Sequence, residues 1–209
     1  MIITTNILSL LSCHRFLTVN ELAKLAQLNT IDCQKSLAVL EQHHLICKRK
    51  FAGRDYFINN DDTNITNLGR KARAYLSHRK QAVQLGKART CYHHLAGEAG
   101  IVMFQQLLTA KWIAPAGINR YVLTKLGKAK LTELIQQPIH QTKVKTCIDF
   151  SERRPHLAGV LGTQLLRKLT ASGVVSTTGQ RTVILHEPID KLFKAVSYTH
   201  LRAHETRSN

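Results

Sequence analysis

The stretch from residue 18 to residue 58, TVNELAKLAQLNTIDCQKSLAVLEQHHLICKRKFAGRDYFI, carries the strongest local folding signals of this 209-residue chain. Thr18 and Glu21 have the spacing of a capping box, in which the hydroxyl accepts a backbone hydrogen bond and the carboxylate reaches back. This pattern predicts a helix of about eight residues that begins after Thr18. Gln27-Leu28-Asn29 then predicts a tight turn.

A second helix is predicted to begin after Asn29 or Thr30 and to run to about His43, with Cys33, Leu37 and Leu40 on its buried stripe. Beyond it, residues 45–51 predict a strand, 52–54 a turn and 55–58 the returning strand. Upstream, the spacing of apolar residues predicts a short helix over residues 3–11.

This order of helices followed by a basic hairpin is that of a winged helix–turn–helix domain. In that fold the second helix of the pair presents its N-terminal polar face to base edges, and hairpin cations lie near phosphates. The alternative is a small helical domain with an ordinary surface hairpin. The predicted DNA-binding residues are Thr30, Asp32, Gln34, Lys35 and Ser36 on the helix and Lys48, Arg49, Lys50 and Arg54 on the hairpin.

Charge and cysteine content narrow the class of protein. The chain has 30 Lys and Arg against 13 Asp and Glu, a net charge of +17 that is spread along its whole length. Such a charge indicates a polyanionic partner, most often nucleic acid. The five cysteines are odd in number and widely spaced, so a reduced, cytoplasmic protein is expected. Neither a membrane span nor a signal peptide is predicted.

The second half of the chain contains a duplication. The segment HLAGEAG at residues 94–100 recurs as HLAGVLG at residues 156–162, and the offset of 62 residues continues without gaps afterwards. Each copy predicts a helix, a hydrophobic corner, a glycine turn, a strand and a further helix, and it resembles the helix–wing half of a winged helix. Two copies indicate a pseudo-twofold module. A basic helix is predicted before them, over residues 68–85.

The predicted fold class is therefore α+β and mainly helical: a winged helix–turn–helix, a linker helix and a module of two winged-helix-like repeats. The predicted parts are a DNA-binding domain at 1–59, a linker or dimerisation helix at 60–90, and a duplicated domain at 91–196 with repeats at about 91–135 and 147–196. Residues 197–209 do not continue the repeat. They resemble a translated sequencing adapter, and we expect the natural chain to diverge near Lys194.

Two segments, ARTCYHHLAG at 88–97 and CIDFSERRPHLAG at 147–159, resemble a subgroup of the ArsR/SmtB-type bacterial transcriptional regulators. The resemblance extends over about residues 1–195. It implies a usually dimeric repressor that binds a double-stranded DNA operator and senses a metal or another small effector. It also places the recognition helix at 30–43 and the wing at 48–56. The Cys-x-Cys sensor motif of the family is absent, since Cys33 stands alone in the recognition helix.

A set of soft and borderline ligands lies around the two repeated segments, and such ligands suit a transition metal. If the repeats pack face to face, these side chains converge on one metal or thiol-reactive effector site. The competing interpretation is that the histidines are hydrogen-bonded core residues. The candidate metal or effector residues are Cys91, His93, His94, Cys147, Asp149, Glu152 and His156.

The sequence predicts no enzyme. It contains neither a phosphate-binding glycine loop nor a nucleophile with its base, and its carboxylates are scattered. The favoured function is a homodimeric regulator that responds to an effector through its repeats. The alternative is a winged-helix adaptor that binds protein or RNA without sensing an effector.

Overall fold

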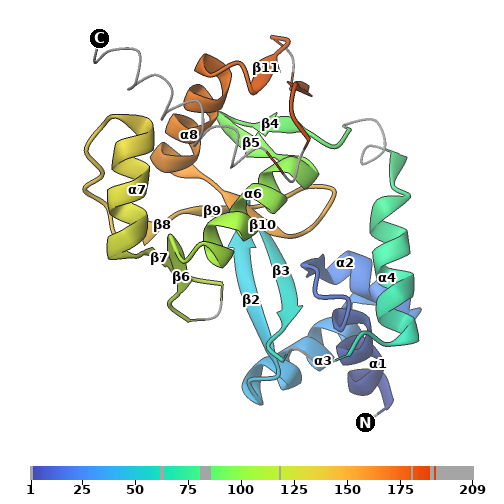
Figure 1. Ribbon diagram of the computed structural model, residues 1–209. Helices are drawn as coiled ribbons and strands as arrows, with labels where there is room; N and C mark the ends of the chain where they lie inside the picture. Colours follow the sequence, from blue (N-terminus) through green and yellow to red (C-terminus); the bar gives the residue numbers. More distant parts are fainter. Residues whose placement is uncertain are drawn as a thin grey trace, which may run out of the picture. The chain divides into compact units, whose positions relative to one another are not determined.

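The computed structural model describes residues 2–61, 64–80, 86–117, 119–179, 181–188 and 191 (Figure 1). The chain divides into two compact units, of which unit 1 comprises residues 1–83 and 150–154 and unit 2 comprises residues 84–149 and 155–209. These limits differ from the predicted boundaries at residues 59 and 90. The adapter-like segment 197–209 lies outside the described residues.

Unit 1 is built from helices around a small antiparallel sheet. Its elements are α1 (Ile2–Leu11), β1 (Leu17–Thr18), α2 (Val19–Ala26), α3 (Thr30–Gln42), β2 (Ile46–Phe51), β3 (Arg54–Asn59) and α4 (Asn67–Ser77). β3 is the central strand and pairs with β1 on one side and β2 on the other. The helices predicted over residues 3–11, 19–26 and 30–43 are confirmed to within one residue at each end.

Local side-chain hydrogen bonds explain where these helices begin. The predicted capping box is present: the Glu21 amide donates to Thr18 Oγ1 at 3.3 Å, and the Thr18 amide donates to Glu21 Oε2 at 2.9 Å. At the start of α3 the Asp32 amide donates to Asn29 Oδ1 at 2.8 Å. Between the two helices, Gln27 takes a left-handed conformation that ends α2. The pair α2–α3 therefore follows from residues adjacent in sequence.

α4 belongs to the core of unit 1. Its Ala72 and Leu76 are buried in the same cluster as Ile7 and Leu11 of α1, which is why residues beyond 59 group with this unit. The helix predicted over residues 68–85 ends at Ser77, where the Arg79 Nε atom donates to the Leu76 carbonyl at 3.2 Å. Residues 81–85 of that prediction lie outside the described residues.

Unit 2 contains the duplication, and the structure reproduces its 62-residue offset. The first repeat comprises β4 (Arg89–Cys91), β5 (His94–Ala96), α6 (Gly97–Thr109), β6 (Ile113–Pro115), β7 (Tyr121–Leu123), α7 (Lys125–Ile135) and β8 (Lys143–Val144). The second comprises β9 (Thr146–Ile148), β10 (Pro155–Leu157), α8 (Gly159–Ala171), β11 (Val175–Thr177) and β12 (Val183–Leu185). The bounds of α6, β6 and β7 plus 62 are those of α8, β11 and β12.

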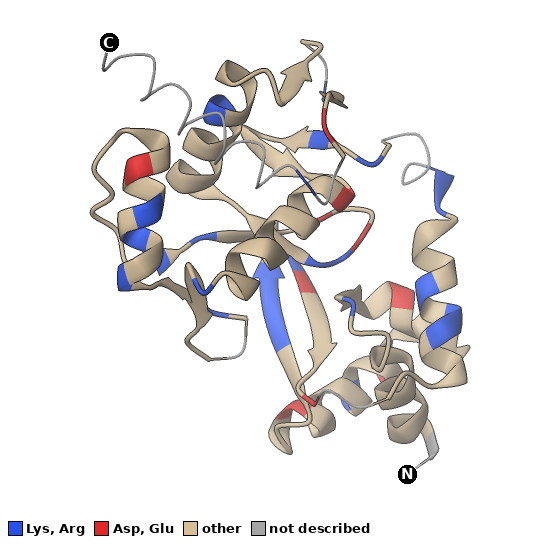
Figure 2. Ribbon diagram, in the orientation of Figure 1, with Lys and Arg blue, Asp and Glu red and all other residues tan. Residues whose placement is uncertain are grey.

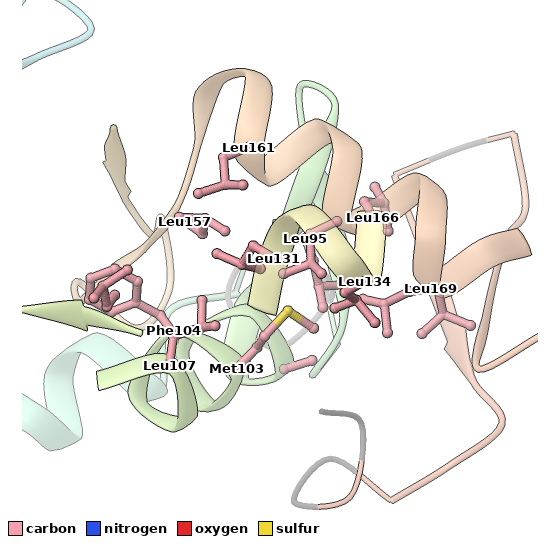
Figure 3. Packing of buried hydrophobic residues seen from close by; sticks show 14 of the residues in the cluster. Leu95, Met103, Phe104, Leu107, Leu131, Leu134, Leu157, Leu161, Leu166 and Leu169 are labelled. Carbon is pink, nitrogen blue, oxygen red and sulfur yellow. The ribbon is translucent and has the colours of Figure 1, made fainter. Parts of the chain in front are cut away.

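The two repeats share one hydrophobic core. Leu95 of β5 and Leu157 of β10 are buried in it with the inward faces of α6 and α8, as Figure 3 shows. Their glycines interlock reciprocally: a Cβ atom on Gly100 would lie 3.6 Å from His156 Cβ, and one on Gly162 would lie 3.0 Å from His94 Cβ. The distance at Gly162 is shorter than an ordinary Cβ contact, so a residue without a side chain favours this approach, whereas the distance at Gly100 is an ordinary van der Waals contact.

The architecture is a mixture of helices and small antiparallel sheets, compatible with the predicted α+β class. Among the described residues, no helix has both the length and the apolar character needed to cross a membrane.

Candidate DNA-binding surface and candidate metal centre

The N-terminal half of α3 presents polar side chains to solvent. Thr30, Gln34 and Lys35 are exposed, while Asp32 and Ser36 are half-buried. Asp32 also has a local partner, since the side-chain nitrogen Nδ2 of Asn29 donates to its carboxylate at 2.7 Å. The opposite stripe of the helix, formed by Cys33, Leu37 and Leu40, is buried in the core. The helix therefore offers one polar face, as the sequence predicts.

The β2–β3 hairpin divides the four predicted cations between its two faces, because side chains alternate along a strand. Lys48 and Lys50 are exposed on one face, and Arg49 is half-buried on the other. Arg54 is exposed just after the two-residue turn, whose members Ala52 and Gly53 both have positive φ angles. Figure 2 shows the run of basic residues on β2 and further ones on α4.

One member of this set has an acidic neighbour. The Lys48 ammonium lies 3.6 Å from the carboxylate of Glu41 on α3, and both side chains are exposed. An exposed pair of this kind contributes little to stability, so the Lys48 ammonium can also bind an external anion.

Ile31 is not among the DNA-binding residues predicted from the sequence. This side chain is 63% exposed at the start of α3, beside the predicted polar contacts. A large apolar residue on the outward face of the N-terminal half of α3 is the signal that identifies it.

Unit 2 gathers four of the seven predicted metal ligands. One sulfur or nitrogen atom from each of Cys91, His94, Cys147 and His156 lies within 4.8 Å of every other. Each repeat supplies one cysteine and one histidine, which stand opposite each other in the β4–β5 and β9–β10 pairings. The duplication and the two short hairpins thus create a four-ligand cluster from residues far apart in sequence.

The geometry and burial of this cluster fit a tetrahedral metal ion. The two Sγ atoms are 3.7 Å apart, and two thiolates on one zinc ion at ~2.3 Å each are separated by ~3.8 Å. His94, Cys147 and His156 are buried and Cys91 is half-buried. Two cysteines and two histidines form a donor set of structural zinc sites.

Unpaired nitrogen atoms in the cluster also favour a metal. His94 Nε2 and both ring nitrogens of His156 are buried without a hydrogen-bond partner. Buried polar groups are ordinarily satisfied, so these atoms suit ligation. The neighbouring Cys147 thiol and the two imidazoles hold the pKa of the Cys91 thiol well below its ordinary value, which favours the thiolate that metals bind.

Comparison with known proteins finds one informative relative. The chain is 29% identical over 176 residues to YdfF of Bacillus subtilis (strain 168), which is described as an uncharacterized HTH-type transcriptional regulator. The match covers 79% of this chain and 78% of the relative. No protein-family model matches the chain, and no solved structure matches it.

The remaining three predicted ligands lie elsewhere. His93 is exposed in the β4–β5 turn and lines a cavity of about 530 Å³ together with Tyr92 and Arg167. Glu152 belongs to unit 1, where it lines a cavity of about 190 Å³ with Arg15 and Arg73. These two residues are therefore separate from the four-ligand cluster.

Asp149 is occupied by structural contacts within unit 2. Its Oδ1 atom accepts from Arg89 Nη2 at 2.6 Å, and its Oδ2 atom accepts from the Gly97 amide at 2.8 Å. Arg89 and Asp149 are both almost fully buried. Asp149 thus accepts a hydrogen bond from the first backbone amide of α6, where the N-cap residue Ala96 has no side-chain acceptor. This ion pair is not predicted from the sequence.

Proposed function

We propose that this protein is a DNA-binding transcriptional regulator in which unit 1 is a winged helix–turn–helix domain. One observation carries the proposal: two capped helices, α2 and α3, precede a basic hairpin, and the second helix exposes its N-terminal polar face. The strand order β1–β3–β2 supports this assignment, and so does the similarity to an HTH-type transcriptional regulator.

In this proposal α3 is the recognition helix. Gln34 reads base edges in the major groove, and the exposed Ile31 contacts a thymine methyl group. Lys35 binds a base or a phosphate, while Lys50 and Arg54 bind phosphates from the hairpin. Asp32 acts mainly within the cap of the helix, because its carboxylate is already hydrogen-bonded there.

The regulator is proposed to be a repressor of the ArsR type that binds its operator as a homodimer in the cytoplasm. Two recognition helices related by a twofold axis match a palindromic operator with half-sites about one helical turn apart. The high net charge of +17 supports attraction to DNA.

The effector is proposed to be a transition metal ion held by Cys91, His94, Cys147 and His156. Zinc is the best match, because two cysteines and two histidines, three of them buried, form a closed donor set whose two sulfur atoms have the spacing of zinc ligands. When bound, the ion supplies a crosslink between the two repeats. We expect metal binding to lower the affinity for the operator.

Mobility-shift titrations with the DNA upstream of the coding sequence test this function. The native protein should bind this DNA more tightly than unrelated DNA of equal length, and added zinc should weaken the specific complex. The double substitution Lys35→Ala and Arg54→Ala should weaken it by at least tenfold. Substitution of the exposed Lys125 and Lys128 on α7 by alanine is the charge-matched control.

Two results would contradict the proposal. Equal binding to all DNA that disappears at moderate salt would favour the adaptor alternative. Unchanged affinity in the Lys35→Ala, Arg54→Ala variant would exclude the assigned helix and hairpin.

A further inference from the structure

Two of the proposed metal ligands, Cys147 and His156, belong to unit 2, but most of the chain between them belongs to unit 1. Cys147 and His156 stand opposite each other in the β9–β10 pairing of unit 2. Residues 150–154 between them, here named the connecting segment, belong to unit 1. The equivalent place in the first repeat holds only the two-residue turn Tyr92-His93 between β4 and β5. This insertion is a departure from the symmetry of the repeats.

The connecting segment is held in unit 1 by buried contacts at both ends. Arg153 Nη2 lies 2.7 Å from Glu21 Oε1, with both side chains largely buried. The Arg153 carbonyl accepts from the Phe16 amide at 2.9 Å. At the other end, Arg79 Nη2 donates to the Phe150 carbonyl at 2.6 Å. The segment is therefore fixed by specific partners.

Arg153 connects two elements of the proposed DNA-binding domain. Its ion-pair partner Glu21 also forms the capping box that begins α2. Its guanidinium stacks on the ring of Tyr56 in β3 at 5.0 Å from the centroid. Arg153 also has a φ angle of 53°, a left-handed conformation that persists in a non-glycine residue only where the surroundings fix it. Its position is sensitive to any shift of the adjoining chain.

Metal binding would act on the ends of this segment. The four ligand atoms are separated by up to 4.8 Å, whereas the edges of a zinc tetrahedron with these donors measure ~3.3–3.8 Å. Binding one ion therefore draws ligands together. Cys147 lies three residues before the segment and His156 two residues after it, so the movement reaches both of its ends through short, directly bonded chain.

We propose that the connecting segment transmits metal occupancy at Cys147 and His156 to α2 through the Arg153–Glu21 ion pair. This inference rests on the proposed function, in which unit 1 binds DNA and the four-ligand cluster binds zinc. In the state that binds DNA, Arg153 of the connecting segment pairs with Glu21. When zinc binds, the four ligand side chains move closer together, and this shifts the equilibrium toward a state in which the pair is broken. Such a device meets the requirement of differential contacts in two states.

The test compares DNA affinity with zinc and with a chelator in the full chain. For the native protein we expect the two affinities to differ roughly 5- to 150-fold, the usual range of allosteric coupling. In Arg153→Gln and in Glu21→Gln the ratio should fall to near one, while each variant still binds one zinc ion per chain. Glutamine at position 21 preserves the capping box, and Arg153→Gln leaves Glu21 paired with Arg79.

The controls separate transmission from simple loss of structure. Arg70→Gln removes a positive charge whose hydrogen bonds stay near the start of α4, with Ile65 and Asn67, and should keep the native ratio. Arg153→Lys should show a larger ratio of the two DNA affinities than Arg153→Gln does, because it keeps the positive charge. Circular dichroism and zinc content establish that each variant is folded and loaded.

The outcomes distinguish the two levels of the proposal. A native protein that binds no zinc, or whose DNA affinity is the same with zinc and chelator, overturns the proposed metal response and the inference with it. A native ratio retained in folded, zinc-loaded Arg153→Gln and Glu21→Gln overturns only the inference, because the coupling must then follow another route.

Discussion

The Sγ atoms of Cys91 and Cys147 lie 3.7 Å apart although the two residues belong to different repeats. Each cysteine faces a histidine across its own hairpin, Cys91 opposite His94 and Cys147 opposite His156. The cluster is therefore divided equally between the repeats. An ion bound there must hold the two halves of unit 2 together, which gives metal binding a measurable effect on stability.

We predict that Cys147→Ser abolishes zinc binding and the stabilisation that depends on it. Zinc at a thousand times its dissociation constant should add about 4 kcal/mol to the free energy of unfolding of the native protein. The variant should show the same melting temperature with zinc and with chelator. Elemental analysis and thermal unfolding measure both effects. Cys47→Ser, at a half-buried cysteine of unit 1, is the matched control and should behave like the native chain.

A second prediction concerns the close packing of α6 against β5 within the first repeat. A Cβ atom on Gly100 would lie 2.4 Å from the Leu95 carbonyl oxygen, which is backbone and cannot move aside easily. Gly100→Ala should therefore lower the free energy of unfolding by roughly 1–3 kcal/mol and weaken zinc binding. Urea titrations measure the first effect. Gln105→Ala, at an exposed position on the same helix, should be nearly neutral; equal losses in both variants would refute the packing argument.

The local elements of unit 1 were predictable because their signals are local. Thr18, Glu21 and Asn29 cap the helices that follow them, so the bounds of α2 and α3 can be inferred from adjacent residues. The end of α4 was not predictable in this way. It depends on Arg79, whose guanidinium donates to the Leu76 carbonyl and also pairs with Glu21, 58 residues away in sequence.

The residue types of the candidate metal centre could be predicted from the sequence, but the particular residues that form it could not. The repeat relates His94 to His156, and a cysteine precedes each histidine, Cys91 by three residues and Cys147 by nine. Their sequence neighbours His93 and Glu152 carried the same chemical signal. The structure decides between them, because Cys91 pairs with His94 and Cys147 with His156 in the hairpins, whereas His93 lies in a turn and Glu152 belongs to unit 1. Register in a hairpin depends on the turn type, on the loop length and on which face is buried.

A third prediction is a pH dependence of stability from the α3 cysteine. Burial raises the pKa of the Cys33 thiol from its ordinary value of 9.0 to about 11. Above pH 9 the unfolded chain therefore loses this proton before the folded protein does, so stability should fall between pH 9 and about 11 and be unaffected by this group below pH 9.

Urea unfolding of the native protein and of Cys33→Val at several pH values checks this expectation. The variant should lose less stability over the interval than the native protein does. Identical curves for the native protein and Cys33→Val would show that the Cys33 thiol is not shifted.

The last prediction separates the structural role of Asp149 from metal ligation. Its carboxylate pairs with Arg89 at 2.6 Å, and both side chains are 1% exposed. Asp149→Asn should cost about 3–5 kcal/mol, because it leaves a buried guanidinium without its counter-charge. Zinc content should stay at one ion per chain, since Asp149 lies outside the four-ligand cluster.

Glu98→Gln provides the control, since it removes an exposed partner of Lys87 and should cost less than about 1 kcal/mol. The decisive comparison is with Cys147→Ser. If Asp149→Asn stays folded below its lowered melting temperature and yet loses zinc as completely as Cys147→Ser does, Asp149 is itself a ligand. If it keeps its zinc while losing stability, the carboxylate serves Arg89 and the start of α6, as the two hydrogen bonds indicate.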